Sequence, residues 1–140
     1  MFHIELQKIY KWTVANKLFL NTEKTVSMIF SNQKIHYFPP LFIKNNLTYD
    51  QIKRVEVTKL LGIHYDEQLK FKHHISHLTN KLSILAGMFY KLKFILPSHI
   101  LKKMYNAHVT SLLNYNIPIW CCNYASNINP ILLLQKRIIL

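Results

Sequence analysis

A regular hydrophobic pattern between residues 71 and 96 constrains the fold of this chain more than any other feature of its sequence. Large apolar residues recur there at alternating intervals of four and three, a mean period of 3.5, which is typical of one face of an α-helix. The members of this hydrophobic stripe are Phe71, Ile75, Leu78, Leu82, Leu85, Phe89, Leu92 and Leu96. The stripe predicts a long amphipathic helix whose apolar face is packed against other helices.

The residues that follow the stripe predict more helices. Pro97 ends the first helix, because proline cannot continue it, and Ser98 can cap the next one. The expected apolar face of that next helix consists of Leu101, Met104, Tyr105, His108 and Leu112. Asn129 and Pro130 open a last apolar and basic segment, either a terminal core helix or a truncated one. We therefore expect an all-helical bundle over residues 69–140 that is truncated at its carboxy terminus.

Shorter and more mixed patterns precede the stripe. Phe2, Leu6 and Ile9 recur at helical spacing and predict a short helix over residues 2–12. Apolar and β-branched runs predict strands at residues 26–30, 41–44 and 55–65, with a turn at 45–46. The predicted fold class is α+β, with a small region of helix plus short antiparallel strands over residues 1–68, followed by the helical bundle.

The charge of the chain points to a polyanionic partner. Lysine and arginine number 18 against 6 acidic residues, a formal net charge of +12 before any of the 8 histidines is protonated. The alternative is a solvated basic surface without a specific ligand, but this threefold excess is larger than solubility requires. We therefore expect the chain to bind nucleic acid.

The cysteines and the hydropathy of the sequence indicate the cellular compartment of the protein. The two cysteines, Cys121 and Cys122, are adjacent and do not make a disulfide framework. The amino terminus has no continuous apolar region, and the most apolar later stretch, residues 84–96, is interrupted by Lys91 and Lys93. These features predict an intracellular protein, cytoplasmic or nuclear, with no membrane partner.

One amino-terminal segment carries a resemblance to a known family. Residues 12–25 read WTVANKLFLNTEKT, with a tryptophan, Asn-Lys-Leu, Leu-Asn and Lys-Thr in that order. This pattern is similar to the region just after the catalytic motif of LINE-type (non-LTR) retrotransposon reverse transcriptases of the Jockey-like kind. The resemblance implies a palm helix followed by a loop whose lysine lies near the incoming nucleotide, and Lys24 is the residue that matches it.

Later segments resemble the same family in the same order. Residues 58–67, TKLLGIHYDE, are similar to the β-hairpin called the primer grip, and Leu61 and Gly62 match its centre, while Leu60 replaces the usual aromatic residue. Two further segments, at residues 69–97 and 112–120, resemble the thumb helices, with Asn116 where glycine is commoner, and the resemblance extends to residues 134–137. The resemblance covers almost the whole chain and implies an RNA template and a DNA primer strand, or their hybrid duplex, as partners.

The family's catalytic residues have no counterpart in this sequence. Polymerisation uses clustered aspartates that hold two divalent metals, Mg²⁺ in the full-length family. That Asp-Asp pair would precede Met1, and the aspartates present, Asp50 and Asp66, lie on separate predicted loops. We therefore expect a catalytically incomplete fragment of an RNA-directed DNA polymerase, with no catalytic residue, metal or cofactor site of its own.

Residual binding is expected along the predicted thumb helix. Basic residues on one flank of the stripe could follow a phosphate backbone, although a solvated helix face is the alternative. The predicted backbone contacts are Lys70, His77 and Lys81, with Met88 on the same flank and Lys91 further round. Tyr90 and Tyr105 could stack on bases, but tyrosines at helical spacing are more often core residues.

Two other interpretations stay open, and a zinc site is set aside. A small basic RNA- or DNA-binding module without enzymatic activity, derived from such an element, would share the same structure. A helical protein-interaction domain would use the stripe once the rest of the palm is missing. His73 and His77 share a helix face as a zinc pair would, but Cys121 and Cys122 make poor further ligands.

Overall fold

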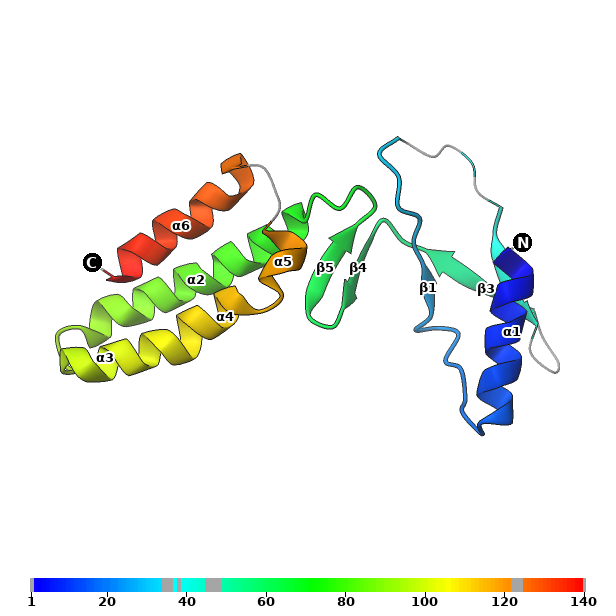
Figure 1. The fold of residues 1–140 in the computed structure, drawn as a ribbon, viewed down its shortest axis with the longest axis horizontal. Coiled ribbons are helices and arrows are strands. Elements are labelled where there is room, and N and C mark those ends of the chain that lie inside the picture. The colour runs from blue at the N-terminus through cyan, green and yellow to red at the C-terminus, as the bar shows by residue number, and fades with distance from the viewer. Residues whose placement is uncertain (1, 34–36, 38, 45–48, 122–124, 140) are drawn as a thin grey trace. The chain divides into compact units, whose positions relative to one another are not determined.

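The computed structural model describes residues 2–33, 37, 39–44, 49–121 and 125–139. It is a mixed α+β protein, as predicted, with helices and two small sheets (Figure 1). The chain divides into two compact units, Met1–Thr58 and Lys59–Leu140. Among the described residues, no helix combines the length and the apolar character needed to cross a bilayer.

A helix and a three-stranded sheet form the first unit. The elements are α1 (Phe2–Ala15), β1 (Val26–Ser27), β2 (Leu41–Lys44) and β3 (Tyr49–Arg54), and the strand order is β1-β3-β2. Helix α1 confirms the helix predicted over residues 2–12 and contacts β2. Ile43 of β2 and Ile52 of β3 are buried, and the buried Thr13 of α1 donates a hydrogen bond from Oγ1 to the carbonyl oxygen of Tyr10.

The strands of this sheet depart from the prediction in two ways. β2 and β3 are antiparallel, with Leu41 opposite Ile52, but β1 and β3 are parallel, with Val26 opposite Lys53. Parallel neighbours need a long crossover connection, and residues 28–48, which include β2, supply it. The strand predicted over residues 26–30 ends at Ser27 because its partner β3 ends at Arg54. The turn predicted at 45–46 lies outside the described residues.

A β-hairpin begins the second unit and packs on its longest helix. The hairpin consists of β4 (Val57–Leu60) and β5 (Ile63–Asp66), so the strand predicted over residues 55–65 is interrupted. Leu61 and Gly62 make a two-residue turn in which both φ angles are positive, 47° and 85°, as in the tight turns that suit a twisted hairpin. β5 contacts α2, and the boundary between the two compact units falls within β4. The predicted division after residue 68 instead separates the hairpin from the helices.

Helices make up the rest of the second unit. They are α2 (Lys72–Leu92), α3 (Ser98–Tyr105), a π-helical turn η1 (Asn106–Thr110), α4 (Ser111–Asn114), α5 (Ile117–Trp120) and α6 (Ala125–Ile139). Most of the stripe is buried in one core, which also takes Val109, Leu113, Trp120 and Ile131 from the other helices. α6 lies along α2 (Figure 1). Because the stripe is covered by the chain itself, it is not an open surface for a partner helix.

The ends of three helices differ from the prediction. α2 ends at Leu92 rather than at Pro97, and a turn at residues 93–95 connects the helix to the proline. Ser98 is the first residue of α3 and not its cap; Pro97 occupies the cap position without a side-chain hydrogen bond. α6 runs through Pro130 instead of starting there, so the helix lacks one backbone hydrogen bond at this position, because proline has no N–H.

The π-helical turn changes which face of its helix is buried. A π-helical turn inserts an extra residue and rotates the subsequent residues around the helix axis. Val109 is therefore fully buried, and the predicted face residue His108 is exposed. The other predicted members of this face, Leu101, Met104, Tyr105 and Leu112, pack against the core as expected.

Candidate nucleic-acid interface

The tip of the β4–β5 hairpin is fixed by a tyrosine from the helical part of the second unit. The hydroxyl of Tyr115 donates a hydrogen bond to the carbonyl oxygen of Leu61 at 2.7 Å. Trp120 in turn donates from Nε1 to the carbonyl oxygen of Tyr115 at 2.9 Å. A Cβ on Gly62 would lie 3.4 Å from Cε1 of Tyr115, and the φ of +85° is one that side chains disfavour, so this position requires glycine. The structure thus brings together two segments that carry the resemblance.

A groove of about 570 Å³ is lined by the hairpin, by α2 and by the segment from η1 to Tyr115. We call it the hairpin groove. Its basic and aromatic lining residues are Lys59 of β4, His74, His77 and Lys81 of α2, His108 of η1, and Tyr115. Its floor is apolar and includes Leu78, Leu85 and Leu112. A basic rim over an apolar floor is a surface that accepts both phosphates and bases.

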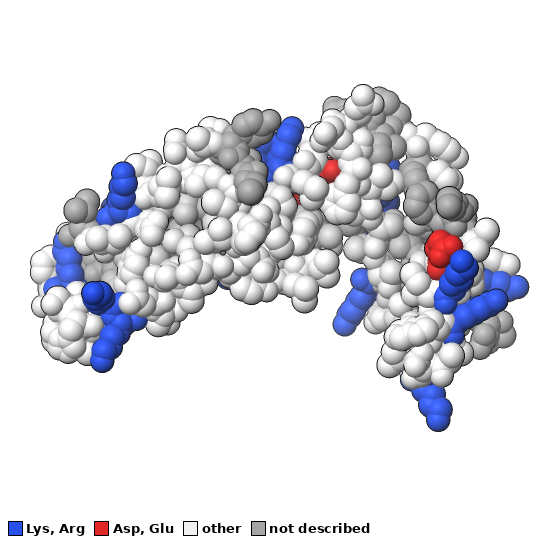
Figure 2. Space-filling model, in the orientation of Figure 1, with Lys and Arg blue, Asp and Glu red and all other residues white. Residues whose placement is uncertain are grey.

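The surroundings of the hairpin groove are positively charged. Lys59 and Lys81 are exposed, and the described residues that line the groove include no acid. From residue 59 onward the sequence holds ten lysines or arginines and two acids, Asp66 and Glu67. The α3 and α6 end of this unit accordingly shows lysine and arginine side chains without acidic ones (Figure 2). Such a field attracts a polyanion and speeds its association.

Two histidines that line the groove form a cluster with a third that does not line it. The ring centroid of His64 of β5 lies 5.0 Å from that of His77 and 6.1 Å from that of His74. His74 is only 3% exposed and packs edge-on against Trp120, at 5.8 Å. Neither ring nitrogen of His74 has a hydrogen-bond partner among the described residues, nor does Nδ1 of His64. The surroundings of the cluster therefore favour the neutral form of its imidazole rings.

Burial and neighbouring charge disfavour protonation of this cluster. Desolvation lowers the pKa of His64, His74 and His77 below 6.5, and it is the largest cause in each case. Positive neighbours add to it: Lys59 for His64, the other two histidines for His74, and Lys81 for His77. At neutral pH the charge of the groove therefore comes from its lysines, and acidification adds to it.

The structure brings together some of the predicted contact residues and not others. Gly62, His77 and Lys81 line the groove, and Leu61 stands at the hairpin tip. Lys70 precedes α2, where its backbone N–H donates to Oδ1 of Asp66 at 2.8 Å, and it is not a lining residue.

Lys91 is also separate from the groove. It is exposed in the last turn of α2, ten residues after Lys81. With 3.6 residues per turn, it lies roughly 80° around the axis and about 15 Å along it from Lys81. A nucleic-acid strand that contacts both Lys81 and Lys91 must therefore wind around the helix.

Lys24 belongs to the other compact unit, in the loop between α1 and β1. Its side chain is exposed, and its backbone N–H donates to Oδ1 of Asn21 at 3.0 Å. The hydroxyl of Thr25 donates to the carbonyl oxygen of Asn21 at 2.7 Å. Asn21 therefore organises the turn that presents Lys24, and this is what the Leu-Asn and Lys-Thr pattern does locally.

Sequence patterns missed two lining residues of the groove and one neighbour of its histidines. Lys59 of β4 and His108 of η1 line the groove, and His64 of β5 lies beside His77; none of the three is near His77 or Lys81 in the sequence. The signal that could have indicated Lys59 and His64 is the short connection between the hairpin and α2, which keeps the hairpin beside the first turns of that helix. The placement of His108 depends on the π-helical turn, for which the sequence offered no signal.

Carboxylates and possible metal ligands are dispersed. Among the described residues, no group of three or more histidines, cysteines, aspartates or glutamates is arranged to hold a metal ion. Asp50 of β3 accepts a hydrogen bond from Oγ1 of Thr22 at 3.1 Å, and Asp66 is bonded to the backbone of Lys70. These two aspartates belong to different units.

No family model matches this chain, and neither does any curated protein or solved structure. Its function is therefore inferred from the sequence motifs and from the geometry of the hairpin groove.

Proposed function

We propose that the hairpin groove binds the sugar-phosphate backbone of nucleic acid, and that the chain is a catalytically incomplete part of a non-LTR retrotransposon reverse transcriptase. The single observation that carries the proposal is the groove itself, in which Lys59 and Lys81 flank a turn fixed by Tyr115 without an acid among the described lining residues. In this proposal the hairpin and α2 hold a template–primer duplex.

The rigidity of the groove supports this role. Phosphate contacts position a duplex only if the groups that make them are themselves held in place. Lys81 stands on a helix of 21 residues whose other face is buried, and Lys59 on a hairpin anchored at its tip. The backbone positions from which the two lysines extend are therefore held by packed elements.

Chemistry by this chain alone is not part of the proposal. Template-directed polymerisation needs clustered carboxylates that hold two metal ions. Asp50 and Asp66 are the aspartates of the sequence, and each already accepts a hydrogen bond in its own unit. We expect no magnesium-dependent primer extension by the purified chain.

The test is a titration of a fluorescently labelled RNA–DNA hybrid, followed by anisotropy at two salt concentrations. The double variant Lys59→Gln with Lys81→Gln is expected to bind about tenfold more weakly and to have a salt slope smaller by roughly 2, because two phosphate contacts are lost. The matched control, Lys103→Gln with Lys136→Gln, removes the same charge from exposed positions outside the groove. An equal loss of affinity in both variants would show that the groove contributes no more to binding than ordinary surface charge does.

The choice of nucleic acid separates a polymerase remnant from a general binding module. A primer-grip role predicts tighter binding to a hybrid with a recessed 3′ end than to single-stranded RNA of the same length. A non-enzymatic module that follows phosphates predicts equal affinities at equal charge. Competition between the two unlabelled ligands measures this preference directly.

A further inference from the structure

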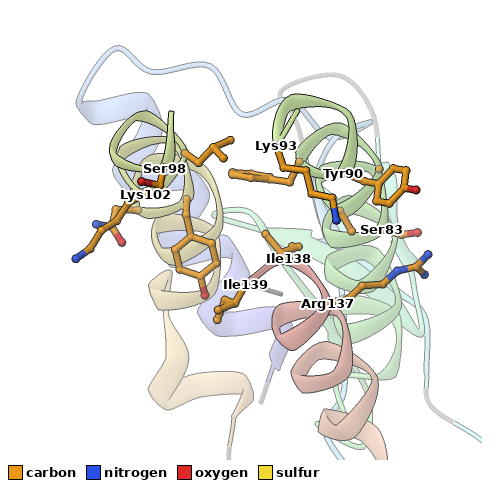
Figure 3. Close-up of a pocket in the computed structure, with 14 residues that line it drawn as sticks. Ser83, Tyr90, Lys93, Ser98, Lys102, Arg137, Ile138 and Ile139 are labelled. Atoms are coloured by element: carbon orange, nitrogen blue, oxygen red, sulfur yellow. The ribbon is translucent and has the colours of Figure 1, made fainter. Parts of the chain in front are cut away.

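A second cavity lies inside the second unit, between α2, α3 and the carboxy-terminal end of α6 (Figure 3). Its volume is about 720 Å³, which falls within the range of small-molecule sites. It shares no lining residue with the hairpin groove. We call it the helical cavity.

The walls of the helical cavity combine apolar and polar side chains. Phe89, Leu101 and Ile138 contribute side chains from three different helices. Beside Gly87 the cavity is open, because a Cβ placed there would meet no atom within 4 Å. Gly87 lines the cavity and carries no side chain, so the space beside it is free for a ligand.

A hydrogen bond ties two of the helices that form the walls. Gln135 of α6 donates from Nε2 to the hydroxyl oxygen of Tyr105 at 2.9 Å. The ring of Tyr105 packs edge-on against Phe89 of α2, with centroids 6.5 Å apart. The side chain of Tyr105 is therefore held by both α2 and α6, which keeps the cavity preformed.

The charged residues of the cavity are cations. Lys93, Lys102 and Arg137 line it, and its described lining residues include no acid. Lys93 and Arg137 lie on the same side as Tyr90, whereas Lys102 comes from α3 on the other side (Figure 3). The Nζ atom of Lys93 lies 4.9 Å from the centroid of the Tyr90 ring, a cation–π distance that restrains the ammonium group near the mouth.

We propose that the helical cavity binds an amphiphilic carboxylate, with its hydrocarbon chain in the space beside Gly87 and its carboxylate at Lys93 and Arg137. The apolar side chains of Phe89, Leu101 and Ile138 select the hydrocarbon chain, because burying apolar surface against them is favourable. The cations select the head group, because arginine and lysine form charge-assisted hydrogen bonds with carboxylates. This inference is independent of nucleic-acid binding, since the two sites have different lining residues.

The experiment titrates the 140-residue chain with dodecanoate below its micelle concentration and measures heat by calorimetry. Dodecanoate is expected to bind with one site per chain, and dodecylamine, which has the same hydrocarbon chain and the opposite charge, is expected not to bind. Equal binding of the amine would overturn the role of the cations. Absence of dodecanoate binding would overturn the proposal as a whole.

Substitution of Gly87 tests the location. Gly87→Leu fills the open space and is expected to weaken dodecanoate binding at least about tenfold, while Gly87→Ala leaves most of the space free and changes affinity little. Both substitutions raise helix propensity, so a loss of binding without a fall in melting temperature reports the cavity rather than unfolding. Unchanged binding by Gly87→Leu would overturn the assigned site.

A double substitution of the cations tests the head group. Lys93→Gln with Arg137→Gln is expected to weaken dodecanoate about tenfold and to leave dodecanol unaffected, because only the charged head is addressed. The matched control is Lys103→Gln with Lys136→Gln, which lie outside the cavity. An equal effect on dodecanoate and dodecanol would contradict the proposed orientation.

Discussion

The two units of this chain bury their apolar residues to very different extents. Among the described residues, the first unit buries Ile43 and Ile52, whereas the second unit buries ten large apolar side chains in one cluster. In the first unit Trp12 is 61% exposed and Phe19 fully exposed.

This difference bears on where a functional site can be held in place. A unit with a small core has little hydrophobic stabilisation to offset its chain entropy. The second unit can therefore hold a groove and a cavity at fixed geometry, and the loop that carries Lys24 has weaker support. The tryptophans report on the two units separately, because Trp12 belongs to the first and the buried Trp120 to the second.

The largest expected effect comes from a substitution that creates a new cavity in the core of the second unit. Leu82→Ala removes a fully buried side chain and is expected to lower the free energy of unfolding by about 2–5 kcal/mol. Urea unfolding followed by Trp120 fluorescence in a Trp12→Phe background measures it. Ile84→Ala on the exposed face of the same helix is the control, with a change below about 0.5 kcal/mol. Similar losses in both variants would mean that the stripe is not the core.

A smaller effect is expected at the hairpin tip. Gly62→Ala places a side chain at φ +85° and against Tyr115, which is expected to cost about 1–2 kcal/mol. Gly87→Ala, in open space within α2, is expected to stabilise by about 0.5–1 kcal/mol. The same urea titration measures both variants. A Gly62→Ala variant as stable as the unsubstituted protein would show that the hairpin turn is not strained as described.

Acidification is expected to act on the second unit through its histidine cluster. The pKa of His74 is lowered in the folded state, mainly by burial, so below pH 6.5 the unfolded chain takes up a proton before the folded chain does. The stability of this unit is therefore complete above pH 6.5 and falls as the pH decreases toward the lowered pKa.

The measurement is the urea midpoint from Trp120 fluorescence between about pH 7.5 and about pH 5. His74→Gln is expected to flatten this pH dependence, whereas His99→Gln, at an exposed position on α3, is expected to leave it unchanged. A midpoint that is constant over this range in the unsubstituted protein would contradict the burial of His74.

The smallest effect is expected in the first unit. Trp12→Ser replaces an exposed side chain on α1 and is expected to change stability by less than about 0.5 kcal/mol. Hydrogen exchange of the amides in β2 and β3 measures this change within the unit. A loss of more than about 1 kcal/mol would show that Trp12 is packed, and the contrast between the two cores would disappear.

The parts of the fold that were predicted from the sequence are those with strong local periodicity. The stripe from Phe71 predicted α2, and the apolar spacing from Phe2 predicted α1, because helical periodicity does not depend on the identity of the partner. β3 was missed because Tyr49–Arg54 is mostly polar and buries one side chain, Ile52. Such a strand is recognised by its neighbours in the sheet and not by its own pattern.

The candidate site was predicted only in part, for a related reason. His77 and Lys81 were identified because they share one flank of a predicted helix, and Gly62 because it carries a motif. The opposite wall of the groove could not be predicted, because Lys59 and His108 reach it only through the hairpin turn and the π-helical turn.

By itself the sequence determined the α+β class, the long amphipathic helix and a strong positive charge, since these depend on composition and on spacing along the chain. The tertiary structure alone decided that Tyr115 bonds to Leu61 across 54 residues, that His64 joins His74 and His77, and that space remains open beside Gly87. The physical reason is that grooves and cavities are formed between elements distant in sequence, and their geometry depends on packing that no local pattern encodes.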